Sequence, residues 1–284
     1  MGVNLSLIGT WEESLGIPDL RGGAMVNHRP VSQMRLGHRH KELELNLVLK
    51  GTAAYLLGDR RYELRRNTLV WLFPGQDHIL LDKSENYEMC LGLFKPWLIE
   101  SVCRTEIHKV LMQANPSGYF CRQLGEDASR SLETLLEAVA TAADDLDRLN
   151  AGLAWALLSA WRAFNSADDT DTGVELHPAV DRAVRLMRSS DVPESLEDLA
   201  AAAGLSLSRL SKVFKAQMGV GLVDFRNRGR MESFLNLYGQ GRRLSITTAA
   251  LEAGFGSYPQ FHRVFRDHMG CSPAEYRRKL AAKL

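Results

Sequence analysis

The order of apolar and polar side chains divides the chain into a strand-rich first part and a helix-rich second part. Between about 20 and 96, alternation and short apolar runs predict strands at 42–49, 53–57, 61–64 and 69–73. Turn-forming residues separate these runs: Gly51, Gly58-Asp59 and Pro74-Gly75. Short strands joined by tight turns are typical of an antiparallel sandwich or barrel.

After Pro96 the apolar residues recur at three-and-four spacing, which predicts helices over 128–148 and 153–164. Residues 165–173 are acidic and carry no apolar side chain larger than alanine, so we expect a flexible linker there. The helical pattern then continues to the end. The predicted fold class is α+β, with an antiparallel β-barrel over 1–96, a helical dimerisation segment over 97–165, a linker over 166–176 and an all-α domain over 177–284.

Composition adds a charge asymmetry to this division. The chain has 284 residues, enough for two domains that each bury a core. Its net charge is only +1, but residues 177–284 hold 17 Lys and Arg against 10 Asp and Glu, whereas the rest holds 18 against 24. The basic end therefore predicts a polyanionic partner. No apolar run approaches the about 18 residues of a membrane helix, so we expect a cytoplasmic protein with no membrane contact.

The basic part contains an internal repeat. Residues 209–219 match 260–270 at an offset of 51, and residues 199–205 match 249–255 at an offset of 50. Each copy has a small-residue helix, a glycine (Gly204 or Gly254) where the chain must turn, and a second helix with an apolar stripe. This arrangement is that of a helix-turn-helix unit, which binds DNA through its second helix.

The polar faces of the two second helices are rich in groups that can contact bases and phosphates. The candidate DNA-binding residues are Ser208, Arg209, Ser211, Lys212 and Lys215 in the first copy, and Tyr258, Gln260, His262, Arg263 and Arg266 in the second. The alternative is that these are only the solvated faces of a helical bundle. Repetition of the pattern in the one basic part of the chain favours double-stranded DNA as the partner.

Three segments resemble the AraC family of transcription regulators: 206–219, 244–257 with its Gly-Phe-Gly-Ser end, and 261–277 with Gly-Cys-Ser-Pro-Ala-Glu-Tyr-Arg. The resemblance covers about 195–279. It implies two recognition helices in successive major-groove segments, joined by a long helix over about 222–238, and it makes RNA polymerase an expected partner. Gly229 inside that helix and Gly239 after it depart from the family pattern.

The first strand carries a possible ligand site. His38, His40 and Glu44 share strand parity, whereas the leucines of the strand point the other way, and His78 follows a Pro-Gly turn further on. These motifs resemble the cupin barrel over about 34–94, which implies a sensor barrel with a ligand cavity. His38, His40, Glu44 and His78 would then hold a divalent metal (Zn, Ni, Mn or Fe) or line an effector pocket without metal. The alternative is an ordinary solvated strand face.

The combination favours a ligand-responsive, sequence-specific transcription regulator whose barrel senses a sugar or another small metabolite. Apolar stripes at Leu132, Leu135, Leu136 and Val139, and at Leu153, Trp155, Leu157, Leu158 and Trp161, predict a homodimer seam, or packing on the barrel alone. Two other functions stay open from the residues: a metal-dependent cupin enzyme, and a structural DNA binder without effector control. The attached DNA-binding pattern disfavours the enzyme, and the length given to the barrel disfavours the structural protein.

Overall fold

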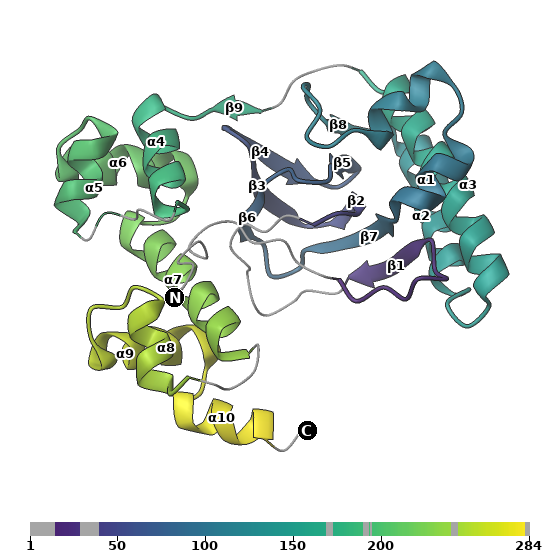
Figure 1. Cartoon of the computed structure of the whole chain (residues 1–284). Helices are drawn as coiled ribbons and strands as arrows, with labels where there is room; N and C mark the ends of the chain where they lie inside the picture. The colour runs from purple at the N-terminus through teal and green to yellow at the C-terminus, as the bar shows by residue number, and fades with distance from the viewer. Residues whose placement is uncertain are drawn as a thin grey trace, which may run out of the picture. The chain divides into compact units, whose positions relative to one another are not determined.

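The computed structural model of the protein describes residues 15–28, 40–168, 173–189, 193, 195–239 and 244–281. It divides into two compact units, an N-terminal unit that ends at Leu176 and a C-terminal unit that begins at His177. Figure 1 shows sheets and helices in the first unit and helices alone in the second. Among the described residues, no helix combines the length and apolarity that crossing a bilayer requires.

The strands of the N-terminal unit form two antiparallel sheets. One sheet has five strands in the order β1 (Gly23–His28), β7 (Glu88–Phe94), β2 (Leu43–Lys50), β5 (Thr68–Leu72) and β8 (Cys121–Gln123). The other has four, in the order β6 (His78–Lys83), β3 (Thr52–Leu57), β4 (Arg60–Arg65) and β9 (Val174–Glu175). Within the described chain no strand ladder joins the two sheets, so the expectation of a closed barrel is wrong and the unit is a sandwich.

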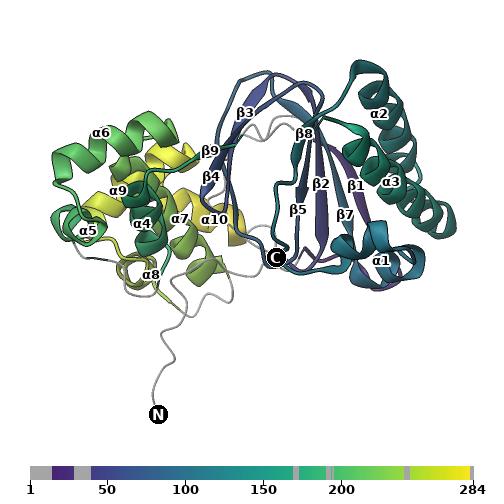
Figure 2. The same cartoon turned by 90° about the horizontal axis from the view of Figure 1, so that it is seen from above.

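Helices cover one face of the five-stranded sheet, so the unit has three layers (Figure 2). They are α1 (Pro96–Val102), the 3-10 helix η1 (Glu106–Met112), α2 (Glu126–Ala140) and α3 (Leu146–Ser166). Strand β2 is the central element, because Leu43, Leu45 and Leu47 pack in one core with Trp71 and the helices. Its alternate residue Val48 packs between the sheets with Tyr55 and Leu57 of β3. Both faces of β2 are therefore buried.

Two segments differ from the predicted elements. The helix expected over 128–148 ends at Ala140, and α3 begins after Asp145, whose carboxylate accepts a 3.0 Å hydrogen bond from the Arg148 amide. The expected linker over 166–176 has structure at its C-terminal end, where β9 pairs with β4. The Leu176 amide also donates to the Asp59 carbonyl at 3.0 Å.

The C-terminal unit contains α4 (Pro178–Met187), α5 (Leu196–Ala203), α6 (Leu207–Met218), α7 (Leu222–Gly239), α8 (Ile246–Glu252), α9 (Tyr258–Met269) and α10 (Pro273–Ala281). Serine hydroxyls cap the N-termini of α5, α6, α8 and α9 by accepting a backbone N–H. Gly204 and Gly254 adopt positive φ values of 85° and 86° at the turns after α5 and α8. The unit therefore contains two similar helix pairs, α5–α6 and α8–α9, joined by α7.

Candidate functional site

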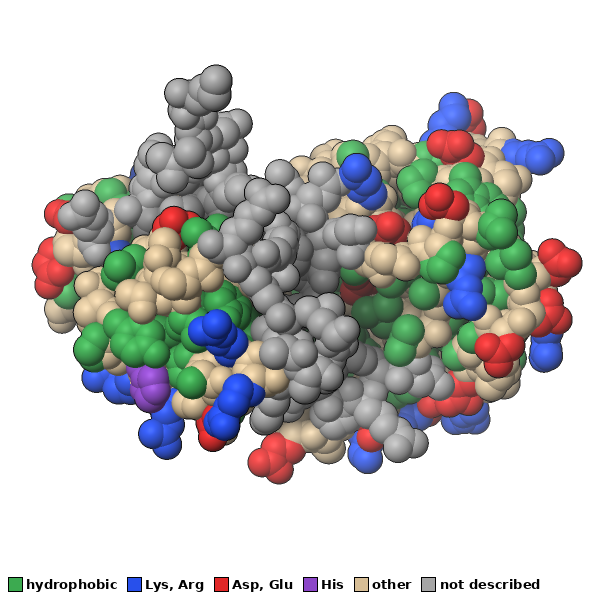
Figure 3. All heavy atoms as spheres, turned by 60° about the horizontal axis from the view of Figure 1, so that its bottom comes forward, with side chains coloured by type: hydrophobic (Ala, Val, Ile, Leu, Met, Phe, Trp, Pro, Cys, Tyr) green, Lys and Arg blue, Asp and Glu red, His purple; other side chains and the backbone are tan. Residues whose placement is uncertain are grey.

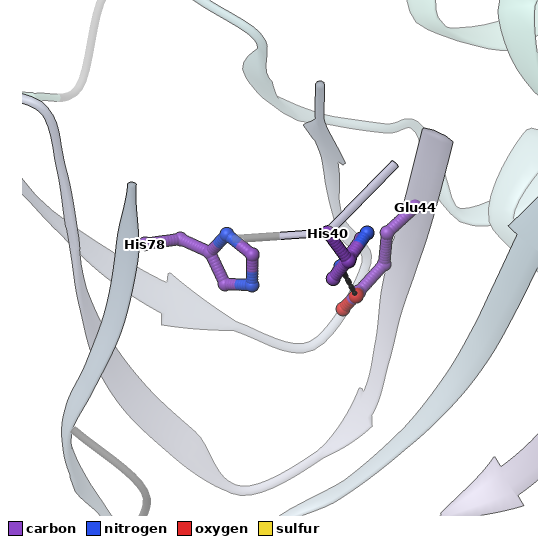
Figure 4. A group of neighbouring side chains, drawn as sticks. All are labelled: His40, Glu44 and His78. Atoms are coloured by element: carbon purple, nitrogen blue, oxygen red, sulfur yellow. Dashed lines mark hydrogen bonds and ion pairs between the residues drawn. The ribbon is translucent and has the colours of Figure 1, made fainter. Parts of the chain in front are cut away.

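A buried cluster of His40, Glu44 and His78 lies inside the N-terminal unit. Glu44 lies on β2, His40 just before it, and His78 reaches from β6 of the other sheet toward them (Figure 4). One ligand atom from each residue lies within 4.8 Å of the others, and the two imidazole rings are 5.3 Å apart. The side chains are only 2% to 6% exposed, so the alternative of a solvated strand face is wrong. The fourth predicted member, His38, lies outside the described residues.

Each member of the cluster has a second hydrogen-bond partner that orients it. The Nδ1 atoms of His40 and His78 lie 2.9 Å and 3.1 Å from the backbone carbonyls of Glu42 and Gln76. A carbonyl only accepts, so both Nδ1 atoms carry a proton, and Nε2 is the ring nitrogen through which each histidine would bind a metal. The Asn46 amide donates to Glu44 Oε1 at 2.8 Å. Such outer partners typically orient metal-binding histidines and carboxylates.

The contact between His40 and Glu44 favours a positive charge on the imidazole. His40 Nε2 lies 2.8 Å from Glu44 Oε2, and its other nitrogen faces a carbonyl, so both ring nitrogens meet acceptors. Burial alone would lower the pKa of His40, but the hydrogen bond and negative charge of Glu44, with the Glu42 carbonyl, raise it above its ordinary value. Either a proton or a metal cation on Nε2 satisfies this contact.

A polar chain continues from Glu44 into the space between the sheets. Asn46 lies 3.4 Å from the Tyr55 hydroxyl, and the hydroxyls of Tyr55 and Tyr87 lie 3.8 Å and 3.3 Å from Met89 Sδ. Burial raises the pKa of both tyrosines, so they stay neutral hydroxyls. The buried Asn46 Oδ1 accepts no hydrogen bond from the described chain. The sequence analysis missed Asn46, although Asn46 shares strand parity with Glu44.

The donor set of the cluster fits a transition-metal ion. Two imidazole nitrogens and one carboxylate are ligands that Zn, Ni, Mn and Fe accept, whereas Mg and Ca prefer oxygen alone. With metal–ligand bonds of about 2.0 to 2.2 Å, ligand atoms lie about 3 to 3.5 Å apart. His40 Nε2 and Glu44 Oε2 lie 2.8 Å apart and all three ligand atoms lie within 4.8 Å of one another, so side-chain adjustments would bring them to bonding distance of one ion.

The candidate DNA-binding side chains lie on α6 and α9, where Arg209, Ser211, Lys212 and Lys215 occupy the positions equivalent to Gln260, His262, Arg263 and Arg266. Those exposed to solvent are Ser208, Arg209, Lys212, Lys215, Tyr258, Arg263 and Arg266, and those half-buried are Ser211, Gln260 and His262. The opposite faces are buried through Leu210 and Phe214 in α6 and through Phe261 and Phe265 in α9. Figure 3 shows Lys and Arg side chains gathered along the lower rim of the C-terminal unit.

The Gln260 side chain forms a hydrogen bond within its own helix pair. Its Oε1 accepts a 3.1 Å hydrogen bond from the Gly256 amide, whereas Ser257 caps the helix by accepting from the Gln260 amide. The carboxamide oxygen is therefore held against the turn before α9. Its NH2 group still carries two donors for an acceptor on a partner.

Two family models match the chain. A model described as an AraC-like ligand binding domain matches residues 28–158, and one described as a helix-turn-helix domain matches residues 199–279. Together they cover most of both units. The first match includes the buried cluster, and the second includes all the candidate DNA-binding residues.

Individual relatives agree with the family models. The uncharacterized HTH-type transcriptional regulator YfiF of Bacillus subtilis is 29% identical over 90% of this chain and 81% of its own length. The arabinose operon regulatory protein of Escherichia coli is 35% identical over 36% of this chain and 37% of its own length. A crystal structure of ToxT from Vibrio cholerae aligns with 89% of this chain and 95% of its own, at 16% identity and a TM-score of 0.36. On the two family models and the two relatives from Bacillus subtilis and Escherichia coli, the chain belongs to the AraC family of transcription regulators and is not an enzyme.

Proposed function

We propose that this protein binds specific DNA sequences through two helix-turn-helix units and adjusts that binding when a small-molecule effector enters its N-terminal unit. The observation that carries the proposal is the duplicated helix pair with exposed cationic side chains at equivalent positions, Lys212 with Arg263 and Lys215 with Arg266. A solvated bundle needs no such equivalence. Helices α6 and α9 are the recognition helices. Each packs against its own helix pair through the apolar stripe on its buried face.

Arg209 and Arg263 are the residues that we assign to base contacts, because both are exposed in the N-terminal half of a recognition helix. A guanidinium that bonds both acceptors of a guanine contributes about 1 to 3 kcal/mol of discrimination. Lys215 and Arg266 lie further along the two helices, where phosphate contacts are expected. Ser208, Ser211 and Lys212, with Tyr258, Gln260 and His262, complete the two reading faces.

The test of this function is selection of a binding site from a randomised duplex library with the full-length chain, followed by affinity measurements. Arg209→Ala and Arg263→Ala should each relax the preference at one or two base pairs and weaken specific binding by about 1 to 3 kcal/mol. Arg278→Ala, which removes an exposed charge from α10, is the matched control. Equal weakening on every sequence would reassign the two arginines to phosphates, and failure to enrich any sequence would overturn the function.

The effector site that we propose is the buried cluster together with Asn46. Glu44 and Asn46 Oδ1 offer acceptors in a place shielded from water, so a ligand that brings hydroxyl donors or a cation fits them. A polyhydroxylated metabolite such as a sugar satisfies the first condition, and a divalent metal that ligates His40, Glu44 and His78 satisfies the second. When bound, such a metal would supply open coordination positions for oxygen atoms of the effector.

Elemental analysis of the purified full-length chain separates these two versions. A metal site predicts about one equivalent of Zn, Ni, Mn or Fe in the wild type and its loss in His78→Ala. His108→Ala is the matched control, because this half-buried histidine of the same unit pairs with Thr105 instead. Wild type without metal, but stabilised by one compound of a sugar and metabolite panel, would leave a plain effector pocket. No metal and no stabilising compound would contradict the sensor.

We also propose a homodimer, in which a second copy covers the outer face of α3. Most of the residues predicted to form a dimer seam are buried within their own unit. Few of them can therefore contact a second copy. Trp155 remains 63% exposed, and Leu158, one turn further along the helix, is half-buried.

A protein of this kind acts on promoters in the cytoplasm, where RNA polymerase is its expected partner.

A further inference from the structure

Helix α7 contacts both helix pairs, each through a different part of its length. Phe225 near its start packs edge-on against Phe214 of α6, with ring centroids 5.3 Å apart. Phe234 near its end packs on Phe261 and Phe265 of α9, at 4.5 Å and 5.7 Å. Gly229 lies between the two parts, where a helix is weakest. The helix is nevertheless continuous from Leu222 to Gly239, so other contacts must hold the two parts in line.

The repeat in the C-terminal unit includes the helix that precedes each pair. A Cβ atom built on Gly204 would lie 3.8 Å from the Arg182 guanidinium of α4, and one built on Gly254 would lie 3.6 Å from Arg230 Nε of α7. The Arg230 guanidinium also lies 6.0 Å from the ring centre of Phe255. Arg182 and Arg230 therefore occupy equivalent places beside the two turns. The first repeat consists of α4, α5 and α6, and the second of α7, α8 and α9.

Arg226 has no equivalent arginine in the first repeat, and its side chain forms a hydrogen bond between the two repeats. It lies on α7 of the second repeat, but its Nη2 donates a hydrogen bond to the carbonyl of Pro193, which precedes α5 in the first repeat. With the same offset that relates Arg182 to Arg230, the position of the first repeat equivalent to Arg226 is Pro178. Proline has no side-chain donor, so it cannot make the corresponding hydrogen bond. The bond to Pro193 therefore belongs to the junction of the two repeats and not to the repeated fold.

Burial of Arg226 is costly, which makes stability alone a poor reason for it. The residue is only 7% exposed. Burial lowers its pKa, and burial together with the charge of Arg226 lowers the pKa of Arg230 to about 10. Two cations one helical turn apart repel each other, and an apolar side chain would fill the position of Arg226 without that cost. Such a group commonly specifies one arrangement over others.

We propose that Arg226 is a positioning residue that fixes the angle between the two repeats across Gly229, and thereby sets the distance between the two DNA segments that α6 and α9 read. This inference rests on the proposed function, because it requires both recognition helices to engage one duplex. Arg226 need not touch DNA. Its bond to Pro193 restrains the first repeat, whereas Phe234 and its neighbours restrain the second.

The experiment uses the full-length chain and the DNA site selected for it. Affinity is measured for that site and for versions with one base pair inserted or deleted between the two contacted segments. One base pair turns the second segment by about 35°. Wild type should bind the altered sites about tenfold or more weakly. Arg226→Met should reduce this penalty to about threefold or less, because the repeats can then adjust to the new spacing.

Two further variants complete the test. Arg182→Met removes the same side chain beside one turn within the first repeat and should keep the wild-type spacing penalty. Arg226→Lys retains the charge and replaces Arg226→Met if that variant does not fold, as judged by circular dichroism. Lysine lacks the planar fork of arginine, so a reduced penalty is expected there also.

The outcomes are distinct. An unchanged spacing penalty in the folded Arg226 variants would overturn the inference, and so would weakening by one factor on all three sites, which would indicate a phosphate contact. In both cases wild type still binds a two-segment site, so the proposed function survives. A wild-type site that contains only one contacted segment would contradict the proposed two-unit function itself.

Discussion

At the scale of single residues, the pair of His40 and Glu44 shows how position determines chemistry. A histidine and a glutamate on an exposed strand would be separately hydrated and weakly coupled. Here both are buried, their side chains meet at 2.8 Å, and the Glu42 carbonyl and the Asn46 amide take the remaining ring nitrogen and carboxylate oxygen. The pair therefore favours a cation on His40 Nε2, either a proton or a metal ion.

The raised pKa of His40 predicts a pH dependence of stability in chelator-treated protein. A histidine whose folded pKa lies above its unfolded value of about 6.5 stabilises the fold fully below that value and loses this contribution as the pH rises through the folded pKa. The melting temperature of wild type should therefore fall more steeply between about pH 6 and 8 than that of Glu44→Gln, which removes the negative charge that raises the pKa of His40.

Glu44→Gln is close to isosteric, and its carbonyl can still accept the hydrogen bond from Asn46. The comparison is made by following thermal unfolding at half-unit pH steps, with His108→Ala as the control for loss of a histidine outside the cluster. Parallel curves for wild type and Glu44→Gln would show that the His40 proton contributes nothing to the pH dependence.

At the scale of elements, the short strand β9 ties the segment between the units to the N-terminal unit. Arg60 of β4 donates to the Gly173 carbonyl at 3.1 Å and to the Glu175 carboxylate at 3.2 Å, and its guanidinium lies 4.2 Å from the ring centre of Tyr119. The side chains of Val174 and Glu175 are exposed, so few apolar contacts hold the strand. Arg60 is therefore expected to account for much of its attachment.

Arg60→Ala should release β9. Hydrogen bonds from a charged donor contribute about 1.5 to 3 kcal/mol, so amide exchange at Glu175 and Leu176 should become about tenfold faster or more, as measured by hydrogen–deuterium exchange on the full-length chain. Arg65→Ala is the matched control, because Arg65 lies on the same strand but donates to Gln123 of β8. Equal acceleration in both variants, or in neither, would show that the backbone pairing of β4 and β9 holds the strand by itself.

The sequence predicted some elements well and others not at all, for physical reasons. Strand β2 and the two helix pairs were predicted because periodicity and repetition are local properties of the chain. Strand β9 was missed because Val174 and Glu175 form a strand only through the edge of β4, more than 100 residues earlier. The closed barrel was wrong because alternation is the same in a barrel and in a sandwich, and closure depends on hydrogen bonds between distant strands.

In the candidate sites, too, local features were predicted from the sequence and contacts between distant residues were not. Parity along β2 placed Glu44 on the face opposite the leucines, but only the pairing of strands shows that His78 arrives from the other sheet. Asn46 lay on the same face and was overlooked, because an amide next to three leucines carries no ligand signal of its own. On α9 the polar face was predicted, whereas the bond that holds Gln260 to Gly256 depends on turn geometry.

At the scale of the whole molecule, the remaining question is how one chain recognises an operator with enough affinity. The two recognition helices that we propose for each chain would contact a limited length of duplex, and joining two chains would turn the second binding event into an intramolecular one. Helix α3 offers a face for that purpose, since Trp155 projects from the N-terminal unit and is 63% exposed. Exposed tryptophans of this kind are common anchors of protein interfaces.

Trp155→Asp should therefore convert a dimer into a monomer and weaken binding to a DNA site with two copies of the operator by about 100-fold, whereas binding to a single copy should change little. Light scattering measures the mass and fluorescence anisotropy the affinity. Trp97→Asp is the matched control, because this tryptophan of the same unit is 42% exposed but lies on α1. If Trp97→Asp dissociates the protein and Trp155→Asp does not, the seam lies at α1. If the wild type is already a monomer, the linkage between copies must come from DNA itself, and Trp155 is then free to serve another partner.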